Sequence, residues 1–136
     1  MPHLLKVYLA IVPIFLAVDF LWLGLVANRF YKSQLGSLLR TSGPDMSPLW
    51  WAVVGVYLVI PFGIVIFALP PAGSTLLQAA LRGLLYGLVL YLVYELTNLA
   101  LVRDWPLAMA AVDVAWGAFI CGLVTAAAFI ISGRIA

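Results

Sequence analysis

The C-terminal half of the chain contains two long apolar runs joined by a four-residue break. Residues 76–102 read LLQAALRGLLYGLVLYLVYELTNLALV, residues 103–106 read RDWP, and residues 107–131 read LAMAAVDVAWGAFICGLVTAAAFII. About 20 apolar residues cross the hydrocarbon core of a bilayer as a helix, so each run is long enough for one crossing. A break this short joins antiparallel helices. The pattern therefore predicts a transmembrane helical hairpin.

Two more apolar runs, residues 4–27 and residues 49–69, precede this hairpin. The polar stretch 28–48 between them contains the turn-forming sequence SGPD at 42–45. The sequence PPAGS at 70–74 separates the second run from the third. Proline and glycine interrupt helices strongly, so these breaks predict loops between four membrane-spanning helices.

The composition agrees with a membrane protein, because 66% of the residues are hydrophobic and 9% are charged. A typical soluble domain is about 25% charged. Residues 1–136 are therefore expected to form a single all-α domain, an integral membrane four-helix transmembrane bundle. Lys6 precedes the first run as in a signal peptide, but no cleavage motif of small residues follows at the usual distance. We expect that first helix to be retained.

Several functional classes are disfavoured by composition and motifs. The net charge of +2 comes without a basic run, so no nucleic-acid partner is expected. Cys121 is the only cysteine and His3 the only histidine, which leaves neither a disulfide framework nor a metal site built from these residues. No nucleotide-binding fingerprint or nucleophile motif is present. Neither a metal centre nor a cofactor is expected.

The first loop contains a pattern typical of a short amphipathic helix. Tyr31, Leu35, Leu38 and Leu39 recur at helical spacing between polar residues. We interpret this segment as a connector that rests on the membrane surface, with a lid as the alternative. The first and third loops carry four of the seven basic side chains. This bias weakly favours a cytoplasmic position for both loops.

Three acidic side chains fall inside the predicted helices. Asp45 and Asp104 lie in loops, whereas Asp19, Glu95 and Asp113 lie in the first, third and fourth helices. An acid at a helix centre costs about 2.5–3.5 kcal/mol on insertion scales, so each needs a partner or a purpose. Counting residues from the loops puts all three about 12–15 Å from the surface of loops one and three. The sequence therefore predicts one layer of acids.

Polar and aromatic residues at helical spacing extend this layer. In the third helix, Gly83 and Gly87 form a G-x-x-x-G sequence, which lets another helix approach closely. AVDFLW at 17–22 and AVDVAW at 111–116 each hold Asp and Trp three residues apart, on one helix face. The candidate ligand-binding residues are Asp19, Trp22, Tyr91, Tyr94, Glu95, Asn98, Asp113 and Trp116.

No basic residue is expected at the depth of the acids. They must be stabilised by protonation, by a hydrogen-bond network or by a bound cation. A cluster that only locks helix packing is the structural alternative. Hydrogen bonds in one tested membrane protein average about 0.6 kcal/mol, which is small against the insertion cost. A functional cluster is therefore the preferred interpretation.

Several stretches carry a resemblance to a known family. They are YELTNLA at 94–100, DWP at 104–106, DVAWG at 113–117 and DFLWLG at 19–24. Over nearly the whole chain the sequence resembles a bacterial family of small predicted four-helix membrane proteins, catalogued as a domain of unknown function. That family more usually has Asp where Glu95 stands. The resemblance implies the fold and a location in the bacterial inner, or cytoplasmic, membrane, and it implies no activity.

Three functions remain open from the sequence. The first is an intramembrane acidic pocket that binds or transports a proton, a cation or a small amphipathic ligand. Its expected partners are membrane lipids, and transport would require a homo-oligomer. The second is a membrane-embedded acid/base enzyme acting on a lipid or isoprenoid, with Glu95 and Asp113 as the catalytic candidates and Asp19 assisting. The third is a scaffold or accessory subunit of another membrane protein.

Overall fold

The computed structural model describes residues 1–135 and contains four helices long and apolar enough to cross a membrane. Helix α1 spans His3–Leu21 and continues as a π-helical turn, η1, at Trp22–Val26. Helix α3 spans Trp50–Gly63 and continues as a second π-helical turn, η3, at Ile64–Ala68. Helices α4 and α5 span Leu76–Leu101 and Leu107–Ile135. The predicted all-α membrane fold is confirmed.

The structure differs from the expectation at the end of α5 and in the first loop. Helix α5 continues to Ile135, beyond the apolar run, because backbone hydrogen bonding does not require apolar side chains. The first loop contains helix α2 at Asn28–Leu35 and the 3₁₀ turn η2 at Gly36–Leu38. A small antiparallel pair of strands follows, β1 at Thr41–Ser42 and β2 at Asp45–Met46.

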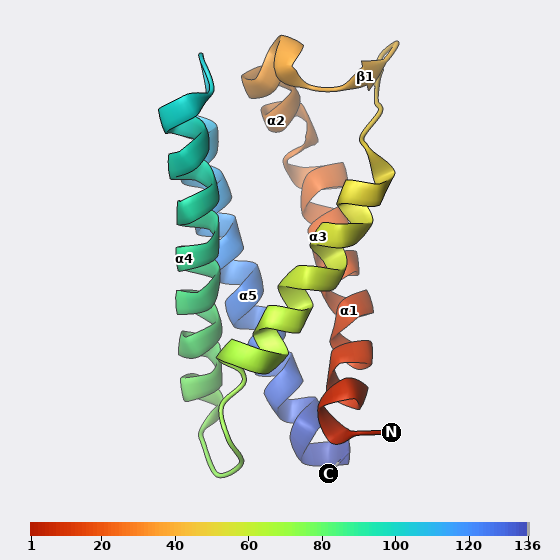
Figure 1. Ribbon diagram of the computed structural model, residues 1–136, viewed down its shortest axis with the longest axis vertical. Coiled ribbons are helices and arrows are strands. Elements are labelled where there is room, and N and C mark those ends of the chain that lie inside the picture. The colour runs from red at the N-terminus through yellow and green to blue at the C-terminus, as the bar shows by residue number, and fades with distance from the viewer. Residues whose placement is uncertain (136) are drawn as a thin grey trace.

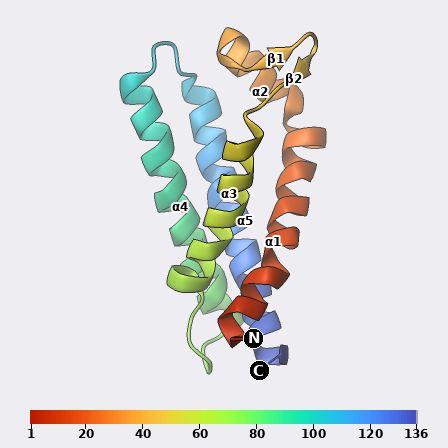
Figure 2. The same ribbon diagram turned by 45° about the vertical axis from the view of Figure 1, so that its right-hand side comes forward.

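Both termini lie at one end of the bundle, and the first and third loops lie at the other (Figures 1 and 2). His3 Nε2 and the Ser132 hydroxyl are hydrogen-bonded at 2.7 Å, which joins the start of α1 to the last turns of α5. Helices α4 and α5 form the tight antiparallel hairpin that the short break predicts. The positions of Gly83 and Gly87 against Cys121 and Gly117 confirm the close approach expected from the G-x-x-x-G sequence.

The apolar core occupies the half of the bundle near the termini. Val7, Ile11 and Phe15 of α1 pack there against Ile120 and Val124 of α5. All five side chains are fully buried. The other half, near the first and third loops, holds the acids instead. The end of the bundle that carries the polar residues therefore lacks the tight apolar packing of the opposite end.

Helix α3 is attached to α4 only near the end of the bundle that holds both chain termini. Arg82 of α4 donates to the carbonyl oxygens of Ala68 and Phe67, which cap the end of η3. The Tyr86 hydroxyl donates to the Ile60 carbonyl at 3.1 Å. Along the rest of its length α3 approaches α1 and not α4. The two helices consequently diverge toward the first and third loops, as the ribbon shows (Figure 1).

Candidate functional site

Asp19 joins three helices through its carboxyl group. The residue lies in the last turns of α1 and is 8% exposed. The Tyr57 hydroxyl of α3 donates to Oδ2 at 2.5 Å, and the Trp116 indole Nε1 of α5 donates to Oδ1 at 2.8 Å. Both carboxyl oxygens therefore have a neutral donor, which replaces part of the hydration lost on burial.

Asp113 is the end of a short hydrogen-bonded chain. The Tyr31 hydroxyl of α2 donates to Asp113 Oδ1 at 3.1 Å, and the Trp22 indole Nε1 lies 3.4 Å from the Tyr31 oxygen. Burial raises the pKa of the Tyr31 hydroxyl above its ordinary value, so this group remains a protonated donor at neutral pH. Helix α2 is thus attached to α5 through a side chain that points down into the bundle.

Glu95 is sealed beneath the third loop. It is 2% exposed, and the Trp105 indole Nε1 donates to its Oε2 at 2.6 Å. Asp104 has a φ of 61°, a left-handed conformation that Asp tolerates better than most residues, and this turn folds the Trp105 ring back over α4. The Asp113 carboxyl is a further acidic neighbour of Glu95.

The two tryptophans of the repeated sequence stack on each other at the α1–α5 interface. The Trp22 and Trp116 ring centroids are 4.4 Å apart, and the ring planes differ by 6°. The spacing predicts Asp and Trp on one face of each helix, but the structure pairs them across helices. Trp116 donates to Asp19, and Trp22 reaches Asp113 through Tyr31. Antiparallel packing of the two helices makes this exchange possible.

The three acids form a staggered row, which corrects the prediction of a single layer. Across the α4–α5 interface Gly87 faces Gly117. This register puts Asp113 opposite Tyr91 and leaves Glu95 one helical turn nearer the third loop. Counting residues from loops assumes upright helices with level ends, whereas α3 and α1 tilt across the bundle (Figure 2).

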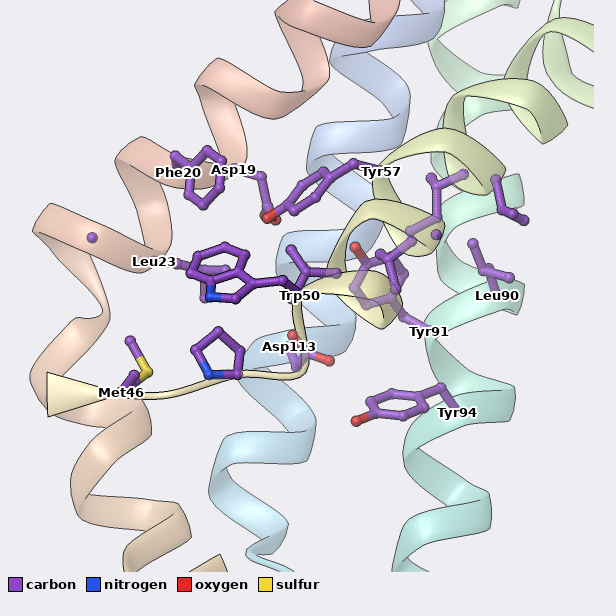
Figure 3. A pocket seen from close by; sticks show the side chains of 17 residues that line it. Asp19, Phe20, Leu23, Met46, Trp50, Tyr57, Leu90, Tyr91, Tyr94 and Asp113 are labelled. Carbon is purple, nitrogen blue, oxygen red and sulfur yellow. The ribbon is translucent and has the colours of Figure 1, made fainter. Parts of the chain in front are cut away.

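Asp19 occupies the deepest position of the row. Its donor Trp116 lies almost one turn beyond Asp113 along α5, away from the third loop. The close-up shows the same order, with Asp113 between Asp19 and Tyr94 (Figure 3). Within residues 1–135, no three His, Cys, Asp or Glu side chains lie close enough together to hold a metal ion.

A cavity of about 930 Å³ lies between α1, α3 and α4 and reaches Asp113 of α5 (Figure 3). We call it the lateral groove. Its walls are mostly apolar, and two carboxyl groups, Asp19 and Asp113, face it. Among the residues of the described chain that line it there is no Lys, Arg or His. The lining residues are Asp19, Phe20, Leu23, Gly24, Met46, Pro48, Trp50, Val53, Gly55, Val56, Tyr57, Val59, Ile60, Leu90, Tyr91, Tyr94 and Asp113.

The lateral groove is open on the side where α3 and α4 diverge. Val56 and Val59 of α3 and Tyr94 of α4 line it and are also exposed on the outside of the bundle. In a membrane this side of the bundle faces the acyl chains. The groove therefore offers a path from the lipid to two acidic groups.

Comparison with known proteins identifies the family. A family model described as "Predicted membrane protein (DUF2177)" matches residues 4–130. The chain belongs to this family. The resemblance found in the sequence is thereby confirmed, together with the membrane character that it implies. No curated protein and no solved structure matches the chain.

The structure of this DUF2177 protein divides the eight sequence-predicted site residues into three groups. Asp19, Asp113, Tyr91 and Tyr94 line the lateral groove. Behind the groove lie the residues that bind or pack against the acids, Glu95, Trp22 and Trp116. Asn98 belongs to neither group. Its buried Nδ2 makes no hydrogen bond, so no contact of this amide group with an acid is formed. The donor to Glu95 is Trp105 instead.

Three partners of the acids were not among the predicted site residues of this DUF2177 protein. The sequence places Tyr31 on a connector at the membrane surface and Trp105 in the short third loop, and the helix of Tyr57 contains no acid that would draw attention to it. A usable signal exists, since Tyr57 lies seven residues after Trp50, where α3 begins. That offset is about 10 Å, close to the depth of Asp19. Matching hydrogen-bond donors to acids by depth would have found it.

Proposed function

We propose that this protein binds a small amphipathic molecule that enters the lateral groove sideways from the bilayer. The hydrocarbon part would occupy the apolar walls, and the polar end would reach Asp19 and Asp113. The observation that supports this most is a cavity of drug-like size with mostly apolar walls and two carboxyl groups at its inner end. Ligand sites typically combine an apolar lining with a few convergent polar groups.

The divergence of α3 from α4 supports entry from the lipid. A molecule dissolved in the membrane would pass between Val59 of α3 and Tyr94 of α4 without crossing the polar loops. Trp50 lines the same groove and is 63% exposed, at the membrane–water interface where indoles are favoured. The polar end of a ligand would move past this ring toward the acids.

The position of Glu95 favours binding over acid/base catalysis. An enzyme of that kind would use two carboxyl groups within reach of the substrate. Asp113 lines the groove, but Glu95 does not and is sealed by Trp105. Glu95 could act on a bound molecule only through Asp113. A scaffold role gives no account of an open groove with acids at its inner end.

We further infer a bacterial cytoplasmic membrane, with the first and third loops on the cytoplasmic side.

The test fills the groove with a side chain. A Cβ added at Gly55 of α3 would meet no heavy atom within 4 Å, so the Gly55→Leu side chain starts in open space and extends into the groove. The protein, carrying Trp51→Phe to remove a lipid-facing indole, is placed in phosphatidylcholine nanodiscs. Three ω-bromododecyl probes, a trimethylammonium, an alcohol and a phosphate, are then titrated, because bromine quenches tryptophan. We expect saturable quenching by at least one probe, and its loss in Gly55→Leu.

Gly133→Leu is the matched control, because Gly133 also has open space around it and lies outside the groove. This variant should retain the quenching of the parent protein. Thermal unfolding of both variants checks that the fold survives, and leucine favours a helix more than glycine does. Binding of all probes that is linear rather than saturable, or equal binding in Gly55→Leu, would contradict the proposal.

A further inference from the structure

The geometry points to a lipophilic organic ammonium cation as the ligand class of the lateral groove, with its head group bound at Asp113. The inference rests on the proposed function and names the substrate chemistry of the same groove. It is carried by the charge of the lining and by its aromatic rings.

The charge of the groove selects against anions. Asp19 and Asp113 are the ionisable carboxyl groups that face it, and no basic residue of the described chain lines it. A phosphate or carboxylate head would meet like charge in an apolar setting, which costs several kcal/mol and is avoided in specific interfaces. An ammonium head has the complementary charge, and its hydrocarbon tail suits the apolar walls.

Aromatic rings line the lateral groove together with the two acids. Five of the lining residues are aromatic and come from three helices: Phe20, Trp50, Tyr57, Tyr91 and Tyr94. The negative face of an aromatic ring attracts cations, and cages of such rings are the usual site for quaternary ammonium groups. A neutral head group would gain nothing from this attraction. Acids and rings together therefore distinguish an organic cation from an alcohol of the same length.

Asp113 is better suited than Asp19 to receive the cation. Asp19 has a donor on each oxygen, from Tyr57 and Trp116, and both donors come from packed helices. Asp113 receives a side-chain donor on Oδ1 only, from Tyr31, and faces the groove. Its remaining neighbour is the Glu95 carboxyl. A cation can therefore reach Asp113 without displacing the donors that hold α1, α3 and α5 together.

Glu95 is the acidic neighbour of Asp113 behind the groove and does not line it. The other titratable groups around Asp113 are Tyr31 of α2, Tyr91 and Tyr94 of α4 and the Asp19 carboxyl of α1.

The three ω-bromododecyl probes described above, in the same nanodiscs, test the inference. We expect the trimethylammonium probe to bind at least about tenfold more tightly than the alcohol or the phosphate. Asp113→Asn should lose most of this preference. Asp45→Asn, which removes one acid from the exposed β2 strand outside the groove lining, should keep it.

The outcomes separate the two proposals. If the alcohol or the phosphate binds saturably, as tightly as the ammonium probe, and Gly55→Leu abolishes that binding, the groove is a ligand site and ammonium selection is wrong. If Asp113→Asn keeps the full preference for the ammonium probe, Asp113 is not the group that binds the cation. If no probe binds saturably, the proposed function itself fails.

Discussion

Neutral aromatic donors, rather than basic side chains, satisfy the three acids within the bundle. Tyr57 and Trp116 bind Asp19, Tyr31 binds Asp113, and Trp105 binds Glu95. Tyrosine and tryptophan carry an apolar ring with one polar atom, so they can be buried in a membrane protein at low cost. A lysine or arginine at the same depth would add a second charge to the insertion cost.

The Tyr57 hydroxyl should contribute measurably to stability because its partner is buried. Tyr57→Phe removes the hydroxyl that donates to Asp19 Oδ2, so that oxygen loses this hydrogen bond. We expect the free energy of unfolding to fall by about 1–3 kcal/mol, the cost of leaving a buried acceptor unpaired. Equilibrium unfolding in mixed micelles with increasing dodecyl sulfate measures this change.

Tyr8→Phe provides the matched control for this residue. The Tyr8 hydroxyl donates to the Leu58 carbonyl at 2.9 Å on an exposed face of the bundle. Its removal should cost about 0.5 kcal/mol or less, because no buried acid loses a hydrogen-bond partner. If the two substitutions have equal effects, the hydrogen bond to Asp19 does not stabilise the fold in the way described.

At the scale of elements, the α4–α5 hairpin depends on two glycines that remove side chains from its interface. A Cβ at Gly87 would overlap the Gly117 carbonyl oxygen and would lie 2.7 Å from the Cys121 Cβ. Backbone atoms cannot move aside as a flexible side chain can. Gly117 in turn leaves room for the Tyr91 ring, which lies directly over it and also lines the lateral groove. The hairpin packing thereby sets the position of one groove wall.

We predict that Gly87→Ala destabilises the protein by about 1–3 kcal/mol, the usual cost of overpacking a close interface. Gly133→Ala is the control within the same hairpin, since a Cβ there meets nothing within 4 Å. That substitution should be neutral, or should stabilise by about 0.5–1 kcal/mol through helix propensity. Thermal unfolding in detergent compares the two variants. Equal stability of both would contradict the close approach of α4 and α5.

The π-helical turns mark the two ends of the groove. η1 continues α1 past Asp19 and contributes Leu23 and Gly24 to the lining. η3 ends α3 at the point where Arg82 attaches it to α4. Such turns occur frequently at functional sites. Each forms the last turn of its helix, η1 on the side of the first and third loops and η3 on the side of the termini.

The whole molecule is packed unevenly, with an apolar core near the termini and an open polar half near the first and third loops. With four spans, the first loop and the second lie at opposite ends of the bundle and are expected on opposite sides of the membrane. The native Cys121 is fully buried and should not react with reagents in water. Single cysteines introduced by Ser37→Cys in the first loop and Ala72→Cys in the second are exposed reporters.

We expect a membrane-impermeant maleimide to label the two cysteine variants from opposite sides of sealed vesicles. Ser37→Cys should react from the cytoplasmic side, in agreement with the excess of basic residues in loops one and three. The protein without either substitution is the background control. Labelling of both variants from one side would contradict the four-span topology, and labelling of Ser37→Cys from outside would reverse the inferred orientation.

The sequence by itself determined the membrane location, the four helices and the tight C-terminal hairpin. Each of these follows from local quantities. The transfer free energy of a run such as residues 107–131 decides whether it inserts, and a break of four residues decides that its neighbour is antiparallel. The close approach at Gly83 and Gly87 follows from side-chain size alone. The need of Asp19, Glu95 and Asp113 for partners was also evident, because burial of an acid is costly wherever it occurs.

Only the tertiary structure decided which donors meet which acids and where the groove opens. Trp116 binds Asp19 rather than the Asp113 of its own helix, and Tyr57 comes from a helix without an acid. Such pairings depend on the tilt and rotation of each helix about its axis. Packing between helices sets these angles, and hydropathy leaves them undetermined. The separation of α3 from α4 has the same origin, because the Arg82 and Tyr86 contacts hold α3 at one end and leave the other end free to lean on α1.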